Sequence, residues 1–214
     1  MARITVLGGT GYTGAQLVRE AAARGHEVRS ISRNPPRDPI AGVTYDTASL
    51  LDDAARQRAV DGADVVLGAL AARGELEPEL RGAYARLAEL AAQSGARWGV
   101  IGGFSSLRLA SDAPRIAAGD LPPQFAAEAR TMVEVLDDLE AEAPEALDWF
   151  FVSPAADYGA HVPGVATGTY RLGSDVALFD ADGASVLSGP DLATAVIDEI
   201  DVPRHRRTQF SVVH

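Results

Sequence analysis

The stretch Val6-Leu7-Gly8-Gly9-Thr10-Gly11-Tyr12-Thr13-Gly14 decides the fold of this chain. An apolar strand pattern precedes the three spaced glycines, and a helical pattern with Leu17, Val18 and Ala21 follows them. The first glycine permits a tight turn, the second lets a pyrophosphate approach the backbone, and the third lets the helix pack closely on the strand. The helix N-terminus offers free N–H groups and partial positive charge to phosphates. The stretch therefore predicts a dinucleotide-binding unit.

Strand and helix patterns alternate along the rest of the chain. This alternation predicts an α/β, Rossmann-like fold, a doubly wound parallel sheet with helices on both faces. The 214 residues contain no linker or repeat, so we expect a single NAD(P)-binding domain over residues 1–214. After the first strand and helix, the patterns predict strands at 27–32, 43–45, 64–70, 98–101, 147–152, 169–172, 176–179, 185–187 and 209–213, and helices at 50–60, 76–91, 125–139 and 191–200, the last capped by Asp191.

Composition narrows the function. The net charge of −11 argues against nucleic acid as a partner, because an acidic surface repels a phosphate backbone. No apolar run reaches the roughly 20 residues of a membrane span, and we expect no signal peptide, no membrane partner and a cytoplasmic location. The chain has no cysteine and no lysine, and its four histidines share no metal-ligand spacing. Thiolate, Schiff-base and tyrosine–lysine catalysts are thus excluded, and we predict no metal site.

The residues after the second predicted strand bear on the choice of nicotinamide cofactor. A carboxylate about 20 positions past the glycines would bind a ribose 2′-hydroxyl and favour NAD. In this chain that position is occupied by Ser32-Arg33-Asn34, and the next carboxylate is Asp38. A guanidinium fits a 2′-phosphate, since it donates two parallel charged hydrogen bonds. We predict NADP(H) in preference to NAD(H), with Arg33 discriminating and Arg37 a helper; the alternative is that Arg33 is an ordinary solvated side chain.

Other polar or small residues fall at predicted strand ends, and each has a plain structural alternative. Asp46 either reaches the adenine or caps the helix that begins near Ser49. Ala69-Leu70-Ala71 either lie under a bound ribose or simply pack tightly.

Two further segments supply the only candidates for substrate contact. Ser105 or Ser106, after Gly102-Gly103, either binds a substrate carbonyl or stabilises a turn. Tyr158 either stacks on a planar substrate or lies on the surface. No catalytic residue is assigned beyond the candidates Ser105 and Tyr158.

The chain resembles the atypical short-chain dehydrogenase/reductase proteins of the NAD(P)H-binding, NmrA-like group, in particular the NADH-flavin reductases and biliverdin-reductase-B-like proteins. The likeness covers nearly the whole chain. Besides the glycine stretch and Arg33-Asn34, it is carried by Val100-Ile101-Gly102-Gly103, Trp149-Phe150-Phe151-Val152-Ser153-Pro154-Ala155, Thr169-Tyr170-Arg171-Leu172-Gly173 and Pro203-Arg204-His205-Arg206-Arg207.

This resemblance implies a Rossmann fold that binds NADPH and transfers hydride to a flavin, quinone or tetrapyrrole. It assigns cofactor contacts to Gly8, Thr10, Gly11, Tyr12, Thr13, Gly14, Arg33, Ala69 and Leu70. With the positions reasoned from strand ends and motifs, the expected set also includes Gly9, Asn34, Asp46, Ala71, Gly102, Gly103, Pro154 and Ala155.

The chain departs from the wider dehydrogenase pattern because it lacks the tyrosine–lysine catalyst, and Phe125 stands where related proteins often carry a tyrosine. Reduction of a ketone needs a proton from a tuned acid, whereas a reduced flavin takes its proton from water. The sequence thus favours a reductase of flat, electron-poor acceptors. The alternative is a non-catalytic NADP(H) sensor that binds a protein partner; a sugar epimerase or dehydratase is disfavoured by the missing catalyst and the short C-terminal portion. The sequence leaves the oligomeric state open.

Overall fold

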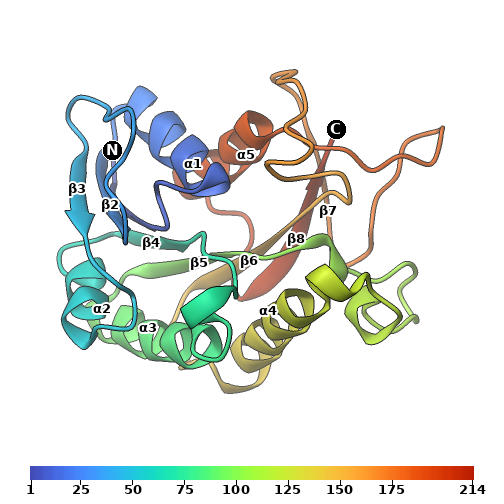
Figure 1. The fold of residues 1–214 in the computed structure, drawn as a ribbon, viewed down its shortest axis with the longest axis horizontal. Helices are drawn as coiled ribbons and strands as arrows, with labels where there is room; N and C mark the ends of the chain where they lie inside the picture. Colours follow the sequence, from blue (N-terminus) through green and yellow to red (C-terminus); the bar gives the residue numbers. More distant parts are fainter.

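The computed structural model describes residues 1–214 and contains one eight-stranded sheet (Figure 1). The strands are β1 (Arg3–Leu7), β2 (Glu27–Ser32), β3 (Thr44–Thr47), β4 (Val65–Gly68), β5 (Arg97–Ile101), β6 (Trp149–Pro154), β7 (Arg171–Gly173) and β8 (Thr208–Val213). Their order across the sheet is β3-β2-β1-β4-β5-β6-β8-β7, and every pair is parallel except β7 with β8.

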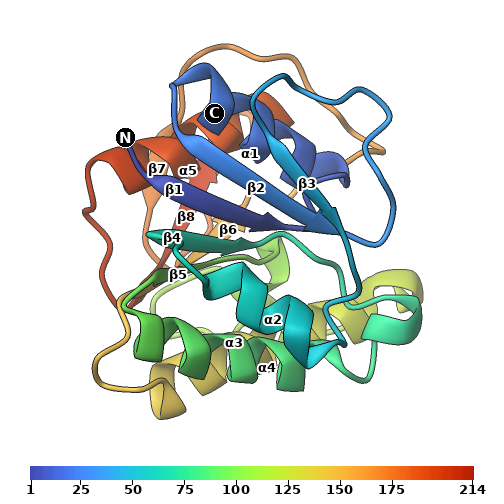
Figure 2. The ribbon, with the colours of Figure 1, turned by 90° about the vertical axis from the view of Figure 1, so that its left-hand side faces the viewer.

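Five helices cover the two faces of this sheet. They are α1 (Tyr12–Ala23), α2 (Asp53–Val60), α3 (Leu80–Ser94), α4 (Pro123–Glu142) and α5 (Gly189–Asp201), with short 3₁₀ turns η1 (Gly74–Leu76), η2 (Phe104–Ser106) and η3 (Ile116–Ala118). Figure 2 shows α1 and α5 on one face and α2, α3 and α4 on the other. The predicted doubly wound α/β fold is confirmed. None of the helices is long and apolar enough to cross a membrane.

Both faces of the sheet are buried, because each has its own apolar core. In β6 the side chains of Trp149 and Phe151 belong to the core under α3 and α4, whereas Phe150 and Val152 belong to the core under α1 and α5. Successive residues of a strand point to opposite faces, so an unbroken apolar run supplies both cores. This explains why the continuous run before Pro154 is a central strand.

The order of the strands creates a crevice beside β1. The chain runs outward from β1 to β3, and then returns to β4 on the other side of β1 before it continues to β5 and β6. The register pairs Leu7 of β1 with Ile31 of β2 and with Gly68 of β4. Connections that leave in opposite directions open a crevice at the carboxyl ends of these strands, where open α/β sheets bind ligands.

The structure differs from the sequence prediction at several elements. The helix expected from residue 76 begins at Leu80, because Pro78 has no backbone N–H to donate inside a helix; residues 74–76 form η1 instead. The strands expected at 176–179 and 185–187 are wrong: Val176 and Val186 make only isolated bridges, to Arg108 and Asp157.

The remaining elements lie within a few residues of their expected bounds. The strand expected at 169–172 is β7, antiparallel at the sheet edge, and β6 continues through Ser153 and Pro154 because both pair with β8.

The predicted cap of α5 is also wrong. Ser188 is the N-cap, and its hydroxyl oxygen accepts a hydrogen bond from the Asp191 backbone N–H. The helix starts earlier than expected because Pro190 suits its first turn. The Asp191 carboxylate instead accepts hydrogen bonds from the backbone N–H groups of Thr167 and Gly168, at 2.9 Å each, so it holds the preceding loop.

We predict that Gly14→Ala destabilises the protein, whereas Gly82→Ala does not. A Cβ at Gly14 would lie 2.1 Å from the Gly8 carbonyl oxygen, a backbone atom, so α1 would have to shift away from β1. We expect the free energy of unfolding to fall by about 2 kcal/mol or more. Gly82 is the matched control, because it lies inside α3 with open space around it, and alanine there should raise stability by up to about 1 kcal/mol. Urea unfolding of both variants measures this, and equal effects would contradict the packing argument.

Candidate cofactor and substrate site

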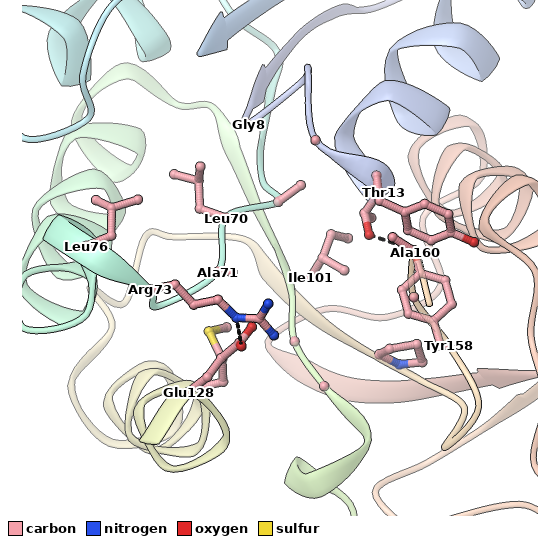
Figure 3. A pocket seen from close by; sticks show the side chains of 18 of the residues that line it. Gly8, Thr13, Leu70, Ala71, Arg73, Leu76, Ile101, Glu128, Tyr158 and Ala160 are labelled. Carbon is pink, nitrogen blue, oxygen red and sulfur yellow. Dashed lines mark hydrogen bonds and ion pairs between the residues drawn. The ribbon is translucent and has the colours of Figure 1, made fainter. Parts of the chain in front are cut away.

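A cavity of about 890 Å³ opens at the carboxyl edge of the sheet. Its lining comes from the ends of β1, β2, β5 and β6, from the loop after β4, and from one side of α4. Its volume falls within the upper part of the range usual for ligand sites. In Figure 3, Gly8 and Thr13 lie on the side of β1 and α1, Leu70 and Arg73 on the side of the loop after β4, and Ile101 between them.

The glycine stretch forms the wall of the cavity beside β1. Gly8 has a φ of +82°, and a Cβ there would lie 2.6 Å from the Ala69 carbonyl oxygen. The Gly11 backbone N–H donates to the Gly8 carbonyl at 2.9 Å, which closes the turn. Both observations agree with the predicted need for glycine at a tight turn.

The N-terminus of α1 remains open to a ligand. Its N-cap is Gly11, which supplies no side-chain cap, and its first turn contains no acidic residue. The first N–H groups of a helix have no partner within the helix, so those of the first turn are free to bind an anion. By contrast, α5 has a serine cap and an aspartate in its first turn. The residues present therefore fit a pyrophosphate group.

Most of the predicted cofactor residues line this cavity: Gly8, Thr10, Gly11, Tyr12, Thr13, Arg33, Asn34, Ala69, Leu70, Ala71, Gly102, Gly103, Pro154 and Ala155. Gly9 and Gly14 lie behind it. A Cβ at Gly9 would meet the Ser30 hydroxyl at 2.3 Å, and Gly14 packs on Gly8. These two glycines therefore serve the packing of the loop. That the lining residues contact a cofactor stays a prediction.

Asp46 does not line the cavity. It lies on β3 with its carboxylate 3.8 Å from the Arg29 guanidinium. Nothing in this position favours contact with an adenine. The alternative, that Asp46 caps the next helix, is wrong, because the N-cap of α2 is Asp52. The strand at 44–47 keeps Asp46 on the sheet edge, several residues before that helix begins.

Arg33 lies at the rim of the cavity, directly after β2. Its guanidinium donates to a carboxylate oxygen of Glu75 at 2.8 Å, and both side chains are about half exposed. Beneath it, the Ser32 hydroxyl accepts a hydrogen bond from the Thr10 backbone N–H at 3.2 Å. This bond ties the glycine turn to the end of β2 and so fixes the distance between the turn and Arg33. Arg37 does not line the cavity.

The other end of the cavity is largely apolar and aromatic. Phe125 of α4 stacks on His161, with ring centroids 6.2 Å apart and an angle of 27° between the planes. We call this end of the cavity the apolar chamber. The sequence predicts it only in part, because it combines one side of α4 with two irregular loops. Its lining includes Phe104, Leu121, Pro122, Phe125, Ala129, Met132, Ala156, Ala160 and His161.

Tyr158 lies between the glycine stretch and the apolar chamber. Its hydroxyl is 2.7 Å from the Thr13 hydroxyl (Figure 3). Its ring packs edge-on against that of Tyr12, with the ring centroids 5.7 Å apart. Burial raises the pKa of the Tyr158 phenol, and the hydrogen bond to Thr13 offsets this only in part. The phenol therefore keeps its proton at neutral pH and is a poor acid. Tyr158 is part of the cavity wall rather than a surface aromatic.

The two serine candidates have different surroundings. The Ser106 hydroxyl is buried, donates to the Gly103 carbonyl at 2.6 Å and lies 2.7 Å from the Ser153 hydroxyl. The Gln209 side-chain amide donates to both hydroxyls. Ser106 thus has the structural role named as its alternative. Both serines line the cavity, and Ser105, which takes no part in these hydrogen bonds, stays a candidate for substrate contact.

A second ion pair crosses the cavity wall. The Arg73 guanidinium lies 2.5 Å from the Glu128 carboxylate of α4, and both residues line the cavity (Figure 3). Sequence analysis missed this pair, because 55 residues separate its members and neither belongs to a motif. No group of three or more acidic or histidine side chains is arranged to hold a metal ion.

Comparison with known proteins gives consistent results. The model of a family described as NAD(P)H-binding matches residues 8–201. The uncharacterized protein YwnB of Bacillus subtilis is 32% identical over 216 residues, which cover 99% of this chain and 98% of YwnB. Among solved structures, a "putative epimerase" of Bacteroides thetaiotaomicron is 30% identical with a TM-score of 0.87, over 100% of this chain and 97% of that one. A "putative NADH-flavin reductase" of Streptococcus pneumoniae is 26% identical with a TM-score of 0.84, over all of both chains.

We predict that two buried phenols make the protein sensitive to alkali. Burial raises the pKa of Tyr84 as well as that of Tyr158, so both stay protonated in the folded state after the unfolded chain has ionised. Their stabilising contribution is full below the unfolded-state pKa of about 10 and is lost as pH rises above it. The chain has no lysine to titrate in this range, and a variant that lacks both hydroxyls separates Tyr84 and Tyr158 from the other three tyrosines.

The measurement is urea unfolding of the wild type and of the Tyr84→Phe/Tyr158→Phe double variant between about pH 8 and about pH 11. The wild-type free energy of unfolding should fall more steeply with pH than that of the variant. Only the slopes are compared, because the loss of the Tyr84 hydroxyl also leaves the Leu70 backbone N–H without its acceptor. Equal slopes would show that these phenols are not the cause.

Proposed function

Because the chain belongs to the NAD(P)H-binding family, we propose that it is a reductase that uses NADPH to reduce a flavin, a quinone or a similar flat, electron-poor acceptor. The observation that carries the proposal is that one cavity joins an open helix N-terminus and glycine turn to an apolar, aromatic chamber. A cofactor held at the first end would direct its nicotinamide toward the second. When bound, NADPH supplies the hydride.

The nucleotide end supports binding through the backbone. The N–H groups at the start of α1 hold the pyrophosphate, and Gly8 and Gly11 keep the wall free of side chains there. Ala69 and Ala71 leave room for a ribose at the end of β4. Arg33 then faces the 2′-position of the adenosine ribose, where its guanidinium favours a phosphate over a hydroxyl.

The acceptor end supports a substrate that needs orientation more than acid catalysis. Phe104, Phe125 and Met132 offer flat or adaptable apolar contacts, which suit a ring system. Tyr158 holds its proton tightly, and Glu128 is paired with Arg73, so neither is a ready proton donor. An acceptor whose reduced form takes its proton from water has no need of one, and positioning accounts for the rate.

Epimerase chemistry, the activity in the name of the Bacteroides structure, finds less support in this chain. The chain has no lysine and therefore no tyrosine–lysine pair to move a proton at a sugar carbon. The lining of the acceptor end is mostly apolar, whereas sugar hydroxyls require several polar partners.

The test of the proposed activity is turnover. Purified protein is mixed with NADPH and, in turn, FMN, riboflavin and a quinone, and oxidation is followed at the nicotinamide absorbance band. We expect oxidation of NADPH that depends on protein and on at least one acceptor. Tight NADPH binding with no turnover across this panel would contradict the proposal and would favour a sensor that binds NADP(H) and a protein partner.

The choice of cofactor has its own test. Arg33→Gln should weaken NADPH binding by about tenfold to a hundredfold, because charge-assisted hydrogen bonds to the 2′-phosphate are lost. NADH has no such phosphate, and its affinity should stay within about twofold. Titration calorimetry with both coenzymes measures the two affinities, and NADH serves as the internal control for folding. An equal loss for both coenzymes would remove Arg33 from its assigned role.

A further inference from the structure

Glu75 forms an ion pair with Arg33, the residue on which the proposed choice between NADPH and NADH depends. The Glu75 carboxylate accepts a hydrogen bond from Arg33 at 2.8 Å, and the two residues are 42 positions apart. Arg33 lines the cavity, whereas Glu75 does not. The pair therefore joins η1, which follows β4, to the loop that follows β2.

The fold does not depend on this ion pair. The exposed fractions of the two side chains are 53% and 48%, and pairs this exposed contribute about 0–1 kcal/mol to stability. The η1 turn is held independently, because Leu76 is buried beneath it and Arg73 beside it pairs with Glu128. Loss of the Glu75 charge should thus leave the backbone of this turn in place.

The Arg33–Glu75 ion pair does affect the binding of a phosphate at Arg33. Two arginines line the cavity, Arg33 and Arg73, and each already has a glutamate partner. A 2′-phosphate that binds Arg33 must displace the Glu75 carboxylate or share the guanidinium with it. Displacement costs the phosphate the energy of the Arg33–Glu75 ion pair, and sharing brings the phosphate dianion close to the Glu75 carboxylate, so in either case the glutamate opposes binding. NADH carries no phosphate there, so it binds with the pair intact.

From this geometry we infer that Glu75 is a specificity-determining residue, which competes with the 2′-phosphate of NADPH for Arg33 and so narrows the preference for NADPH over NADH. The inference rests on the proposed function in one respect, that Arg33 binds the 2′-phosphate. It adds an opposing residue on a different segment. The selectivity of the site is then set by the balance between Arg33 and Glu75.

The test compares Glu75→Gln with Glu77→Gln. Both changes remove one negative charge from the same exposed segment, but Glu77 makes no ion pair and does not line the cavity. Calorimetric titrations use NADPH and NADH, and also 2′,5′-ADP and 5′-AMP, which isolate the phosphate. Glu75→Gln should tighten NADPH and 2′,5′-ADP about fivefold, the size expected for release of one exposed ion pair. NADH and 5′-AMP should change less than about twofold, and Glu77→Gln should change none of the four.

A double variant tests the coupling directly. In the Arg33→Gln background, Glu75→Gln should no longer favour the phosphorylated ligands, because the group for which they compete is absent. The inference is overturned if Glu75→Gln tightens all four ligands equally, if it tightens none, or if Glu77→Gln acts in the same way.

These failures differ from failure of the proposed function. If the wild type binds neither coenzyme, the proposed function and this inference both fall. If Arg33→Gln weakens NADPH selectively while Glu75→Gln has no effect, only the role of Glu75 is wrong.

Discussion

The close contact between α1 and the turn after β1 is the constraint on which the site depends. At Gly14 the helix approaches the backbone of Gly8 and Gly9 with no side chain between them. This approach holds the open N-terminus of α1 directly over the carboxyl end of a central strand. The free amides of the helix therefore lie at the crevice between β1 and β4, and this packing contact and the sheet order together place there a helix N-terminus suited to an anion.

The sequence predicts the fold where the signals are local. The expected bounds of β2, 27–32, are those observed, because Gly25 ends the helix before it and a proline-rich stretch follows it. Prediction fails where pairing partners are distant in sequence. Val176 and Val186 have the composition of strands, but whether a neighbouring strand lies beside them depends on the folding of the whole C-terminal quarter. The cap of α5 fails for a different reason, because Ser188 and Asp191 are both good caps and the position of Pro190 decides between them.

The candidate site divides in the same way. The part of the cavity beside β1 and α1 is formed by the glycine motif and by strand ends. The sequence alone therefore predicts most of the residues that line it. The apolar chamber is formed by contacts between residues whose sequence spacing gives no sign of them. Thr13 contacts Tyr158, 145 positions away, and Phe125 of α4 stacks on His161 of an irregular loop. His161 belongs to no sequence motif that would identify it as a cavity residue. The apolar residues of α4 have the same spacing as those of any helix that covers a sheet. Such a chamber becomes visible only when the loops are placed.

The charges around the cavity follow from the composition of the whole chain. The net charge is −11 and the chain has no lysine, so the permanently cationic side chains of the cavity lining are two guanidinium groups, those of Arg33 and Arg73. The amides at the start of α1 carry no counter-charge, but both arginines of the lining are already paired with glutamates. A phosphate that binds Arg33 or Arg73 would therefore replace a glutamate as the partner of that arginine. A phosphate at the start of α1 would instead gain new hydrogen bonds from backbone N–H groups. If NADPH binds as proposed, the start of α1 supplies affinity for the pyrophosphate, and Arg33 contributes mainly the difference in affinity between NADPH and NADH.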